Sequence, residues 1–408
     1  MSERALTDTQ PISIRRHGPQ LPMGAGFPAL DRTGWLVLSL GVMLLAALMV
    51  GPLASALRES AGPWLTVLAV ATLTSACLVT PSAMLAVRVG ALDIPDRRRV
   101  HDRPTPRLGG LAVFGGIAVA LALNGIPERR TTLLLIASAG LLVVGMFDDF
   151  GGVSARVRLV AQVVAALVVL QGGVVLTVFP HEELSGTAAN AVLTVLWLVG
   201  ITNAFNFFDG MDGLAAGLGI VMAGFLGTIA FRTGQEHVGW VSAAVAGGCL
   251  GFLPFNFRGT RPARVFMGEC GSTVLGFLLA GLAVHGEWAM GHPLINLSAP
   301  LLIFGVLIFD MIHTTVSRIA RGEVRSVRGW LEYTGRDHLH HRFESLLRSK
   351  ARAVLLVHVL AVTLGLSALL IRGVSLEGSV LLLLQCAAIL LVVTILEHAG
   401  NRRERRRP

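Results

Sequence analysis

Apolar residues along this chain gather in runs of about 20 residues, and short polar segments separate the runs. A helix of that length crosses the ~30 Å hydrocarbon core of a bilayer, where the backbone must satisfy its own hydrogen bonds. The pattern therefore predicts an all-α protein, a polytopic transmembrane helical bundle of about 11 to 12 transmembrane helices. The predicted spans are 34–57, 63–87, 108–124, 131–147, 159–179, 190–206, 213–231, 238–257, 271–285, 294–316, 353–371 and 378–395.

Composition agrees with this pattern and excludes several classes of protein. Hydrophobic residues make up 53% of the 408 residues and charged residues only 14%, whereas soluble domains carry ~25% charged residues. An ordinary soluble multidomain protein, a disordered chain and a nucleic-acid-binding module are therefore excluded. The four cysteines form no CxxC pair, which indicates packing residues and not a disulfide framework or a zinc site. They are Cys77, Cys249, Cys270 and Cys386.

The basic residues indicate which ends of the predicted helices face the cytoplasm. With the N-terminus inside, 29 of the 34 Lys and Arg residues fall in the inner segments and five in the outer ones. Cytoplasmic loops of membrane proteins carry an excess of Lys and Arg, so this distribution places both ends of the chain in the cytoplasm. The five outer residues are Arg58, Arg129, Arg130, Arg232 and Arg372.

The expected organisation is one membrane domain with two tails. We expect a cytoplasmic tail over 1–33, an additional N-terminal transmembrane helix over 34–62, the membrane domain over 63–396 and a basic cytoplasmic tail over 397–408. The first apolar run ends in Ala54-Ser55-Ala56, a pattern of small residues that a signal peptidase accepts. Because the run is longer than the ~7 to 15 apolar residues of a signal peptide, an uncleaved helix is favoured over a cleaved one.

Polar and ionisable residues gather in five clusters at the predicted inner ends of the helices. Each such group at a membrane boundary requires a partner, water or a ligand, which makes the clusters candidate functional sites. The first cluster, residues 93–110, is rich in arginine. A positively charged membrane anchor would explain its arginines but not Asp93, His101 or the paired prolines. Arg98, Arg99 and His101 are therefore candidates for binding an anionic ligand.

Two further clusters are rich in carboxylates and amides. Asp148 and Asp149 end a predicted helix, and adjacent carboxylates repel one another unless a cation or a base lies between them. The pair is therefore either a metal or proton site or a solvated helix end. The next cluster places its amides and carboxylates on one face if the turn stays helical. It consists of Asn203, Asn206, Asp209 and Asp212.

The last two clusters combine positive charge with glycine or histidine. Arg264 and Glu269 precede a Gly-Ser helix start, whose backbone donors can hold a phosphate. The final cluster has three histidines within four residues, which suggests zinc, but no second set of ligands accompanies them, so contacts with phosphate oxygens are favoured. Asp310 and His313, inside a predicted helix, are either part of the site wall or a helix–helix hydrogen-bond pair. The histidine cluster contains His338, His340, His341 and Arg342.

These residue types at one membrane face fit phosphoryl transfer assisted by a divalent cation, in which a charged soluble substrate is joined to a lipid phosphate. Mg²⁺ prefers oxygen ligands and bridges phosphates, and Mn²⁺ is an alternative with similar ligand chemistry. A transporter would instead carry polar residues near the bilayer midplane, on broken helices. Because the clusters lie at one face, transport is the less favoured hypothesis.

The clusters contain six motifs: DIPDRRRVHDRPTPRLGG, GMFDD, NAFNFFDGMDGLAAG, PARVFMGECGS, IFDMIH and DHLHHR. In this order and spacing, from about residue 65 to residue 395, they resemble the polyprenyl-phosphate N-acetylhexosamine-1-phosphate transferases. Residues 1–62 lie outside the resemblance. The related phospho-MurNAc-pentapeptide transferases usually carry a contiguous HHHFE where this chain reads HLHHRFE, so the sugar-phosphate branch is favoured.

The resemblance implies transfer of a sugar-1-phosphate, with GlcNAc-1-phosphate favoured, from a UDP-sugar to undecaprenyl phosphate. UMP would be released and cell-envelope polysaccharide synthesis would begin. The resemblance also implies a multi-pass protein of the bacterial inner membrane with its active site on the cytoplasmic side. The expected partners are the UDP-sugar, undecaprenyl phosphate and the lipid bilayer, without nucleic acid, and a homodimer is left open. A phospho-MurNAc-pentapeptide transferase and an inactive homologue that binds polyprenyl phosphate are the alternatives.

Matching positions of the motifs give each candidate residue an expected role. The first aspartate pair is expected beside the lipid phosphate, and the later aspartates are expected to serve catalysis and nucleotide binding. The expected catalytic residues are Asp148, Asp149, Asp209 and Asp212, the expected Mg²⁺ ligands are Asn206 and Glu269, and the expected substrate-binding residues are Arg98, Arg99, His101, Asn203, Arg264, His338, His340, His341 and Arg342.

Two positions depart from the pattern of the family. Arg98-Arg99 stands where the family usually has Arg-Lys, which keeps the charge but replaces a compact ammonium with a planar guanidinium. Glu269 stands where the family usually has Asp, so the carboxylate is one methylene further from the backbone. Mg²⁺ demands a tight coordination geometry. Glu269 is therefore the feature that favours an inactive homologue over an active transferase.

Overall fold

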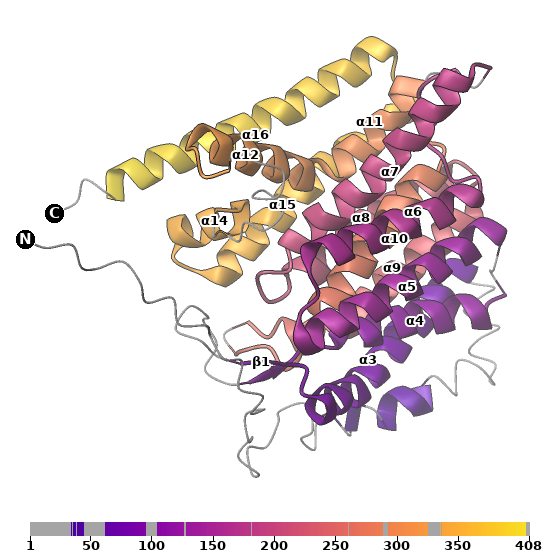
Figure 1. Ribbon diagram of the computed structural model, residues 1–408, viewed down its shortest axis with the longest axis vertical. Helices are drawn as coiled ribbons and strands as arrows, with labels where there is room; N and C mark the ends of the chain where they lie inside the picture. The colour runs from indigo at the N-terminus through magenta and orange to yellow at the C-terminus, as the bar shows by residue number, and fades with distance from the viewer. Residues whose placement is uncertain are drawn as a thin grey trace, which may run out of the picture.

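Helices account for nearly all regular structure of the computed structural model, which confirms the expected all-α fold (Figure 1). The structure describes residues 34, 36, 37, 39–44, 62–94, 104–125, 128–180, 182–259, 261–288, 293–324, 335 and 337–404. A two-residue ladder joins strands β1 (Leu92–Asp93) and β2 (Thr105–Pro106). The helices are α3 (Pro63–Val89), α4 (Gly109–Leu123), α5 (Arg129–Gly151), α6 (Ala155–Gln171), α7 (Leu184–Phe207), α8 (Leu214–Arg232), α9 (Glu236–Asn256), α10 (Gly268–His285), α11 (Pro293–Ile303), α12 (Gly305–Ala320), α14 (Leu339–Leu347), α15 (Lys350–Ala368) and α16 (Leu376–Glu404), with a short 3₁₀ turn at Ile371–Gly373.

Eight helices of the described chain are long and apolar enough to cross a membrane, or nine if α11 and α12 form one broken span. This confirms a polytopic membrane bundle. The number is below the expected eleven to twelve because α4 has only 15 residues and α6 only 17, while a straight span needs ~20. The first predicted span, 34–57, lies mostly outside the described residues.

The predicted helix over 159–179 is wrong in its C-terminal part. Helix α6 ends at Gln171, and Gly173 then adopts a φ of 78°, which other residues rarely reach. Beyond this point the backbone N–H of Leu176 donates to Thr194 Oγ1 of α7 at 2.9 Å. A side chain of a neighbouring helix thus provides the hydrogen bond that the helix would have provided.

The predicted single span over 294–316 is wrong in another way, since α11 and α12 meet at an angle of 77°. Pro300 lacks a backbone N–H and Gly305 begins α12, and both residue types are common causes of a break. The bend directs the buried face of α12, which includes Asp310 and Arg318, toward the chain that enters α14. Figure 1 shows α12, α14 and α16 beside the bundle that α3 to α10 form.

Helix α10 lies at the centre of the bundle, where 89% of its 18 residues are buried. It packs against α4, α5, α7, α8 and α9. Its first turn approaches α4 and α5 so closely that only glycine fits there. A Cβ on Gly110 would collide with the backbone of Gly271, and a Cβ on Gly145 would lie 2.5 Å from Cα of Cys270. Small residues permit this close approach between membrane helices. The polar ends of α4, α5 and α10 consequently lie together.

Gly145→Ala should destabilise the protein, because the added methyl group overlaps the backbone of Cys270 and overpacking costs ~1 to 3 kcal/mol. The matched control is Gly140→Ala on the same helix, where nothing lies within 4 Å of the added methyl group. Thermal unfolding of the detergent-solubilised variants should show a lower midpoint for Gly145→Ala alone. Equal midpoints would contradict the close contact between α5 and α10.

Candidate active site

The carboxylate of Asp149 joins the end of α5 to the beginning of α10. Its oxygens accept the backbone N–H groups of Glu269 and Cys270, each at 3.1 Å, and Nε of Arg107 lies 3.4 Å from Oδ1. The N–H groups of a first helical turn have no acceptor within their own helix. The expectation that backbone donors at this helix start hold a phosphate is wrong for these two groups, because Asp149 already occupies them.

Asp148 is linked to α10 through an arginine of α6. Its Oδ1 accepts the N–H of Val153, and its Oδ2 lies 3.0 Å from Nη1 of Arg158. The same Nη1 lies 3.2 Å from Oε1 of Glu269. Arg158 therefore bridges two of the candidate carboxylates. Arg158 is not among the residues predicted for the site, although its position ten residues after Asp148 is a usable signal.

The two asparagines of α7 have different partners. Nδ2 of Asn206 donates to Oε2 of Glu269 at 2.6 Å and to Oγ of Ser272 at 2.9 Å. Asn206 thus lies beside the carboxylate with which it is expected to bind a metal. Asn203 instead pairs with Gln162 of α6, its Nδ2 lying 2.6 Å from Oε1. Its role in substrate binding stays a prediction, while its contact here joins two helices.

The turn between α7 and α8 adds two carboxylates. Asp209 is partly exposed in this turn, yet its pKa lies well above the usual value because the protein shields it from water and three neighbouring carboxylates repel its charge. Oδ2 of Asp212 accepts the N–H of Ala263 at 3.1 Å, which ties the turn to the loop before α10. A bound cation would relieve this repulsion. The acid cluster, as we name it, consists of Asp148, Asp149, Asp209, Asp212 and Glu269.

The acid cluster supplies the right kind of ligands for Mg²⁺ but not a preformed cage. Within the described ranges, no three His, Cys, Asp or Glu side chains are arranged to hold a metal ion. The expected ligands Asn206 and Glu269 contact each other directly, so a cation would have to displace their hydrogen bond. Their oxygen atoms, together with those of the neighbouring carboxylates, suit a hard cation.

The histidine cluster lies beside the acid cluster because α7 ends in two phenylalanines. His338 stacks on Phe207 with ring centroids 4.8 Å apart, and the ring of His340 lies 5.4 Å from that of Phe208. A Cβ on Gly210 would lie 2.8 Å from Nε2 of His340. The histidines predicted from the sequence therefore contact the turn that carries the later aspartates.

His340 is buried, and its Nδ1 has no hydrogen-bond partner among the residues that the structure describes. Its pKa lies well below the usual value, mainly because burial disfavours the charged ring, and also because His341 and Arg342 repel a positive charge there. His341 is less enclosed, and its Nδ1 lies 3.5 Å from Oε2 of Glu344. The rings of this cluster thus differ in their exposure to solvent.

Of the remaining candidates, Arg264 lies in the part of the chain that the structure describes. Arg264 lies between α9 and α10, where its backbone N–H donates to the carbonyl of Phe255 at 2.8 Å. Arg98, Arg99 and His101 lie outside the described residues, so their roles stay predictions. The described residues on either side of this segment are joined by the pairing of β1 with β2.

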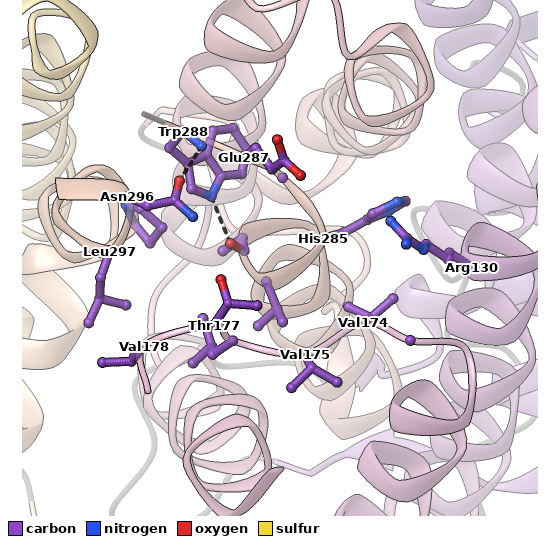
Figure 2. A pocket seen from close by; sticks show the side chains of 16 residues that line it. Arg130, Val174, Val175, Thr177, Val178, His285, Glu287, Trp288, Asn296 and Leu297 are labelled. Carbon is purple, nitrogen blue, oxygen red and sulfur yellow. Dashed lines mark hydrogen bonds between the residues drawn. The ribbon is translucent and has the colours of Figure 1, made fainter. Parts of the chain in front are cut away.

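A separate cavity of about 140 Å³ lies at the other end of the bundle (Figure 2). Arg130 and His285 line it, together with Trp288 and residues 173–178. Arg130 lies in the first turn of α5 and Asp149 in its last turn, which separates them by ~28 Å at 1.5 Å per residue. This cavity is therefore not the candidate active site.

Comparison with known proteins supports the motif analysis. Residues 131–287, which include the acid cluster, match the model of glycosyl transferase family 4. A probable undecaprenyl-phosphate N-acetylglucosaminyl 1-phosphate transferase of Bacillus subtilis (strain 168) is 31% identical over 346 residues, covering 83% of this chain and 93% of the relative. The chain belongs to the polyprenyl-phosphate N-acetylglucosamine-1-phosphate transferase family. This membership confirms the resemblance of the motifs.

Two further relatives of this polyprenyl-phosphate transferase carry different names. A decaprenyl-phosphate N-acetylglucosaminephosphotransferase of Mycolicibacterium smegmatis is 33% identical over 309 residues, covering 68% of this chain and 74% of the relative. A phospho-N-acetylmuramoyl-pentapeptide-transferase of Moorella thermoacetica is 32% identical over 288 residues, covering 65% and 83%. The similarity therefore extends to a related enzyme with another sugar substrate in its name.

Stability should fall on acidification partly because of His340. Its folded-state pKa lies below the unfolded value of 6.5, so the unfolded chain binds the proton more readily. The stability present above pH 6.5 is therefore lost as the pH falls toward the folded-state pKa, by up to ~1.4 kcal/mol per pH unit. Between pH 7.5 and 5.5, the unfolding midpoint of wild type should fall further than that of His340→Gln. The control is His237→Gln, at an exposed histidine, whose unfolding midpoint should change with pH as that of wild type does. The prediction is contradicted if the unfolding midpoints of all three proteins change with pH to the same extent.

Proposed function

We propose that this protein transfers GlcNAc-1-phosphate from UDP-GlcNAc to undecaprenyl phosphate at the cytoplasmic face of the bacterial inner membrane, with release of UMP. The observation that carries the proposal is the acid cluster, which lies beside the histidines of α14 in a member of this transferase family. Such a site would hold two phosphates in reacting position once a cation and the neighbouring basic residues offset their charge. The excess of Lys and Arg on one side supports the cytoplasmic orientation.

The proposed reaction moves a phosphoryl group between two oxygens. An oxygen of the lipid phosphate attacks the β-phosphorus of UDP-GlcNAc, the bond to the bridging oxygen breaks, and UMP leaves with the electron pair. A proton on the lipid phosphate passes to a carboxylate. Asp209 suits this role because it is partly exposed and its raised pKa makes it a stronger base than an ordinary carboxylate. Asp149 has both oxygens bound to backbone N–H groups, so we assign it to positioning α10.

Mg²⁺ is the proposed cofactor, with Mn²⁺ as the alternative, and it would offset the charge of the diphosphate. Asn206 and Glu269 would hold it. Support comes from their oxygen atoms and from the mutual repulsion within the acid cluster. Arg264, His340, His341 and Arg342 are the proposed contacts of the diphosphate, since cationic and N–H donors bind phosphate oxygens.

A second candidate function is transfer of phospho-MurNAc-pentapeptide. It is favoured by the similarity to the Moorella thermoacetica relative. The HLHHRFE sequence, in which Leu339 interrupts the histidines, favours the GlcNAc substrate instead. A comparison of UDP-GlcNAc with UDP-MurNAc-pentapeptide as donors would decide between the two functions.

Purified protein should release UMP from UDP-GlcNAc only when both undecaprenyl phosphate and Mg²⁺ or Mn²⁺ are present, because the oxygen-rich site favours hard cations. UMP release is measured with each component left out in turn and with excess EDTA.

The folded variant Asp209→Asn should lower turnover by at least ~10²-fold, the scale expected for loss of a general base. Full turnover in EDTA would exclude the metal, and normal turnover of the variant would exclude Asp209 as the base.

Variants of Glu269 test its role as a metal ligand. Glu269→Gln keeps the shape but loses the charge, so metal-dependent turnover should disappear. Glu269→Asp should keep turnover but shift the Mg²⁺ dependence, since the shorter carboxylate changes the geometry that Mg²⁺ requires. UMP release is measured against Mg²⁺ concentration for wild type and both variants. Three coincident curves would remove Glu269 from the metal site, and higher activity of Glu269→Asp from a low baseline would indicate a weakly active homologue.

A further inference from the structure

A buried carboxylate of α12 holds the beginning of α14. Asp310 is 1% exposed, and its Oδ1 accepts the backbone N–H of Leu339 at 2.6 Å. Its Oδ2 lies 2.7 Å from Nδ1 of His338. His338 is the N-cap residue of α14, but its side chain makes no capping hydrogen bond. Asp310 therefore caps a helix from another part of the chain and contacts the imidazole of the same N-cap residue.

Arg318 holds the same histidine from the other side. It is 3% exposed, and its Nε and Nη2 lie 2.8 and 2.6 Å from the two carboxylate oxygens of Asp337. Nη2 also lies 3.3 Å from Nε2 of His338. A guanidinium only donates hydrogen bonds, so Nε2 of His338 must accept one. Nδ1 must then carry the ring proton and donate it to Asp310.

We propose that Asp310 and Arg318 are positioning residues that hold His338 in its neutral, Nδ1-protonated tautomer, so that His338 binds no phosphate itself and instead sets the position of the other residues of its cluster. Both ring nitrogens of His338 are engaged by protein groups, and one ring face lies on Phe207. This differs from the expectation that His338 belongs to the diphosphate-binding residues. The kinetic consequences rest on the proposed function, whereas the tautomer does not.

The position of His338 matters because neighbouring groups depend on it. The ring of His340 lies parallel to that of His338, with a centroid distance of 6.1 Å and an interplanar angle of 5°. His340 in turn reaches Gly210 in the turn between α7 and α8. Arg342 approaches Oδ1 of Asp310 at 3.5 Å. Rotation of His338 would therefore displace the candidate phosphate contacts relative to the acid cluster.

Asp310→Asn tests the proposal because it replaces one carboxylate oxygen with an NH₂ group and leaves the size of the side chain almost unchanged. The asparagine oxygen can still accept the N–H of Leu339, but its NH₂ group then faces the Nδ1–H of His338, and two donors cannot bond. If His338 changes tautomer, its new Nε2–H faces the donors of Arg318. No tautomer satisfies both neighbours, so we expect kcat for UMP release to fall by ~10²-fold, the scale for misplacement of a site by about 1 Å. Asp310→Glu, which keeps the charge, should recover part of the loss.

The tautomer is measured independently of activity. In the full-length protein labelled with ¹⁵N-histidine, the signals of His338 are assigned by their loss in His338→Gln. Wild type should show a protonated Nδ1 and an unprotonated Nε2, and Asp310→Asn should lose this signature. The matched control is Glu236→Gln, which removes a carboxylate charge from an exposed position in the first turn of α9. It should leave both the signature and kcat unchanged.

Each outcome decides a different statement. A wild-type His338 protonated at Nε2, or at both nitrogens, overturns the proposal whatever the activity. Folded Asp310→Asn with wild-type kcat and KM overturns the positioning role. If wild type releases no UMP but has the expected signature, the proposed function fails and the tautomer assignment stands. If Asp310→Asn does not fold, Arg318→Lys decides, because an ammonium cannot reproduce the planar fork, and wild-type kcat in that variant overturns the proposal.

Discussion

The carboxylate of Asp149 is the contact on which the rest of the site depends. A buried carboxylate is costly unless hydrogen bonds compensate for its lost hydration, and here two N–H groups of the first turn of α10 provide them. The same bonds satisfy donors that a helix start leaves unpaired. Gly268, at φ 75°, permits this approach, since a Cβ there would lie 2.6 Å from Oδ2 of Asp149 and would collide with the carbonyl of Arg107. The contact fixes the position of the first turn of α10 and therefore the position of the Glu269 carboxylate.

The electrostatics of the site follow from that arrangement. Carboxylates from α5, α10 and the turn after α7 lie close enough to raise the pKa of Asp209, while Arg107 and Arg158 offset only part of the negative charge. Carboxylate oxygens of this kind are the ligands that Mg²⁺ prefers. The same repulsion also raises the pKa of Asp209. The proposed metal site and the proposed base thus lie within one charge distribution.

The break between α11 and α12 gives the second half of the site its geometry. A straight helix would have continued through the bundle, whereas the bend of 77° directs Asp310 and Arg318 toward His338. Phe207 provides the opposite surface by stacking on the same ring. The histidine cluster is therefore fixed by α12 on one side and by the end of α7 on the other. Helix α7 also carries Asn206, which donates a hydrogen bond to Glu269 of the acid cluster. The position of the histidines is therefore linked to that of the acid cluster.

The sequence by itself determined the fold class, the family and the membership of the polar clusters, because apolar run length and local spacing are properties of the chain alone. It did not determine which donor meets which acceptor. The pairing of Asp149 with the start of α10, the bridge formed by Arg158 and the amide pair of Asn203 with Gln162 each join residues of different helices. The irregular segment after Gln171 and the bend before Gly305 depend likewise on contacts with neighbouring helices. Only the tertiary structure decided these features. A polar group in a membrane bundle bonds to the partner that helix packing brings within reach. The spacing of residues along the sequence does not determine the distance between polar groups on different helices.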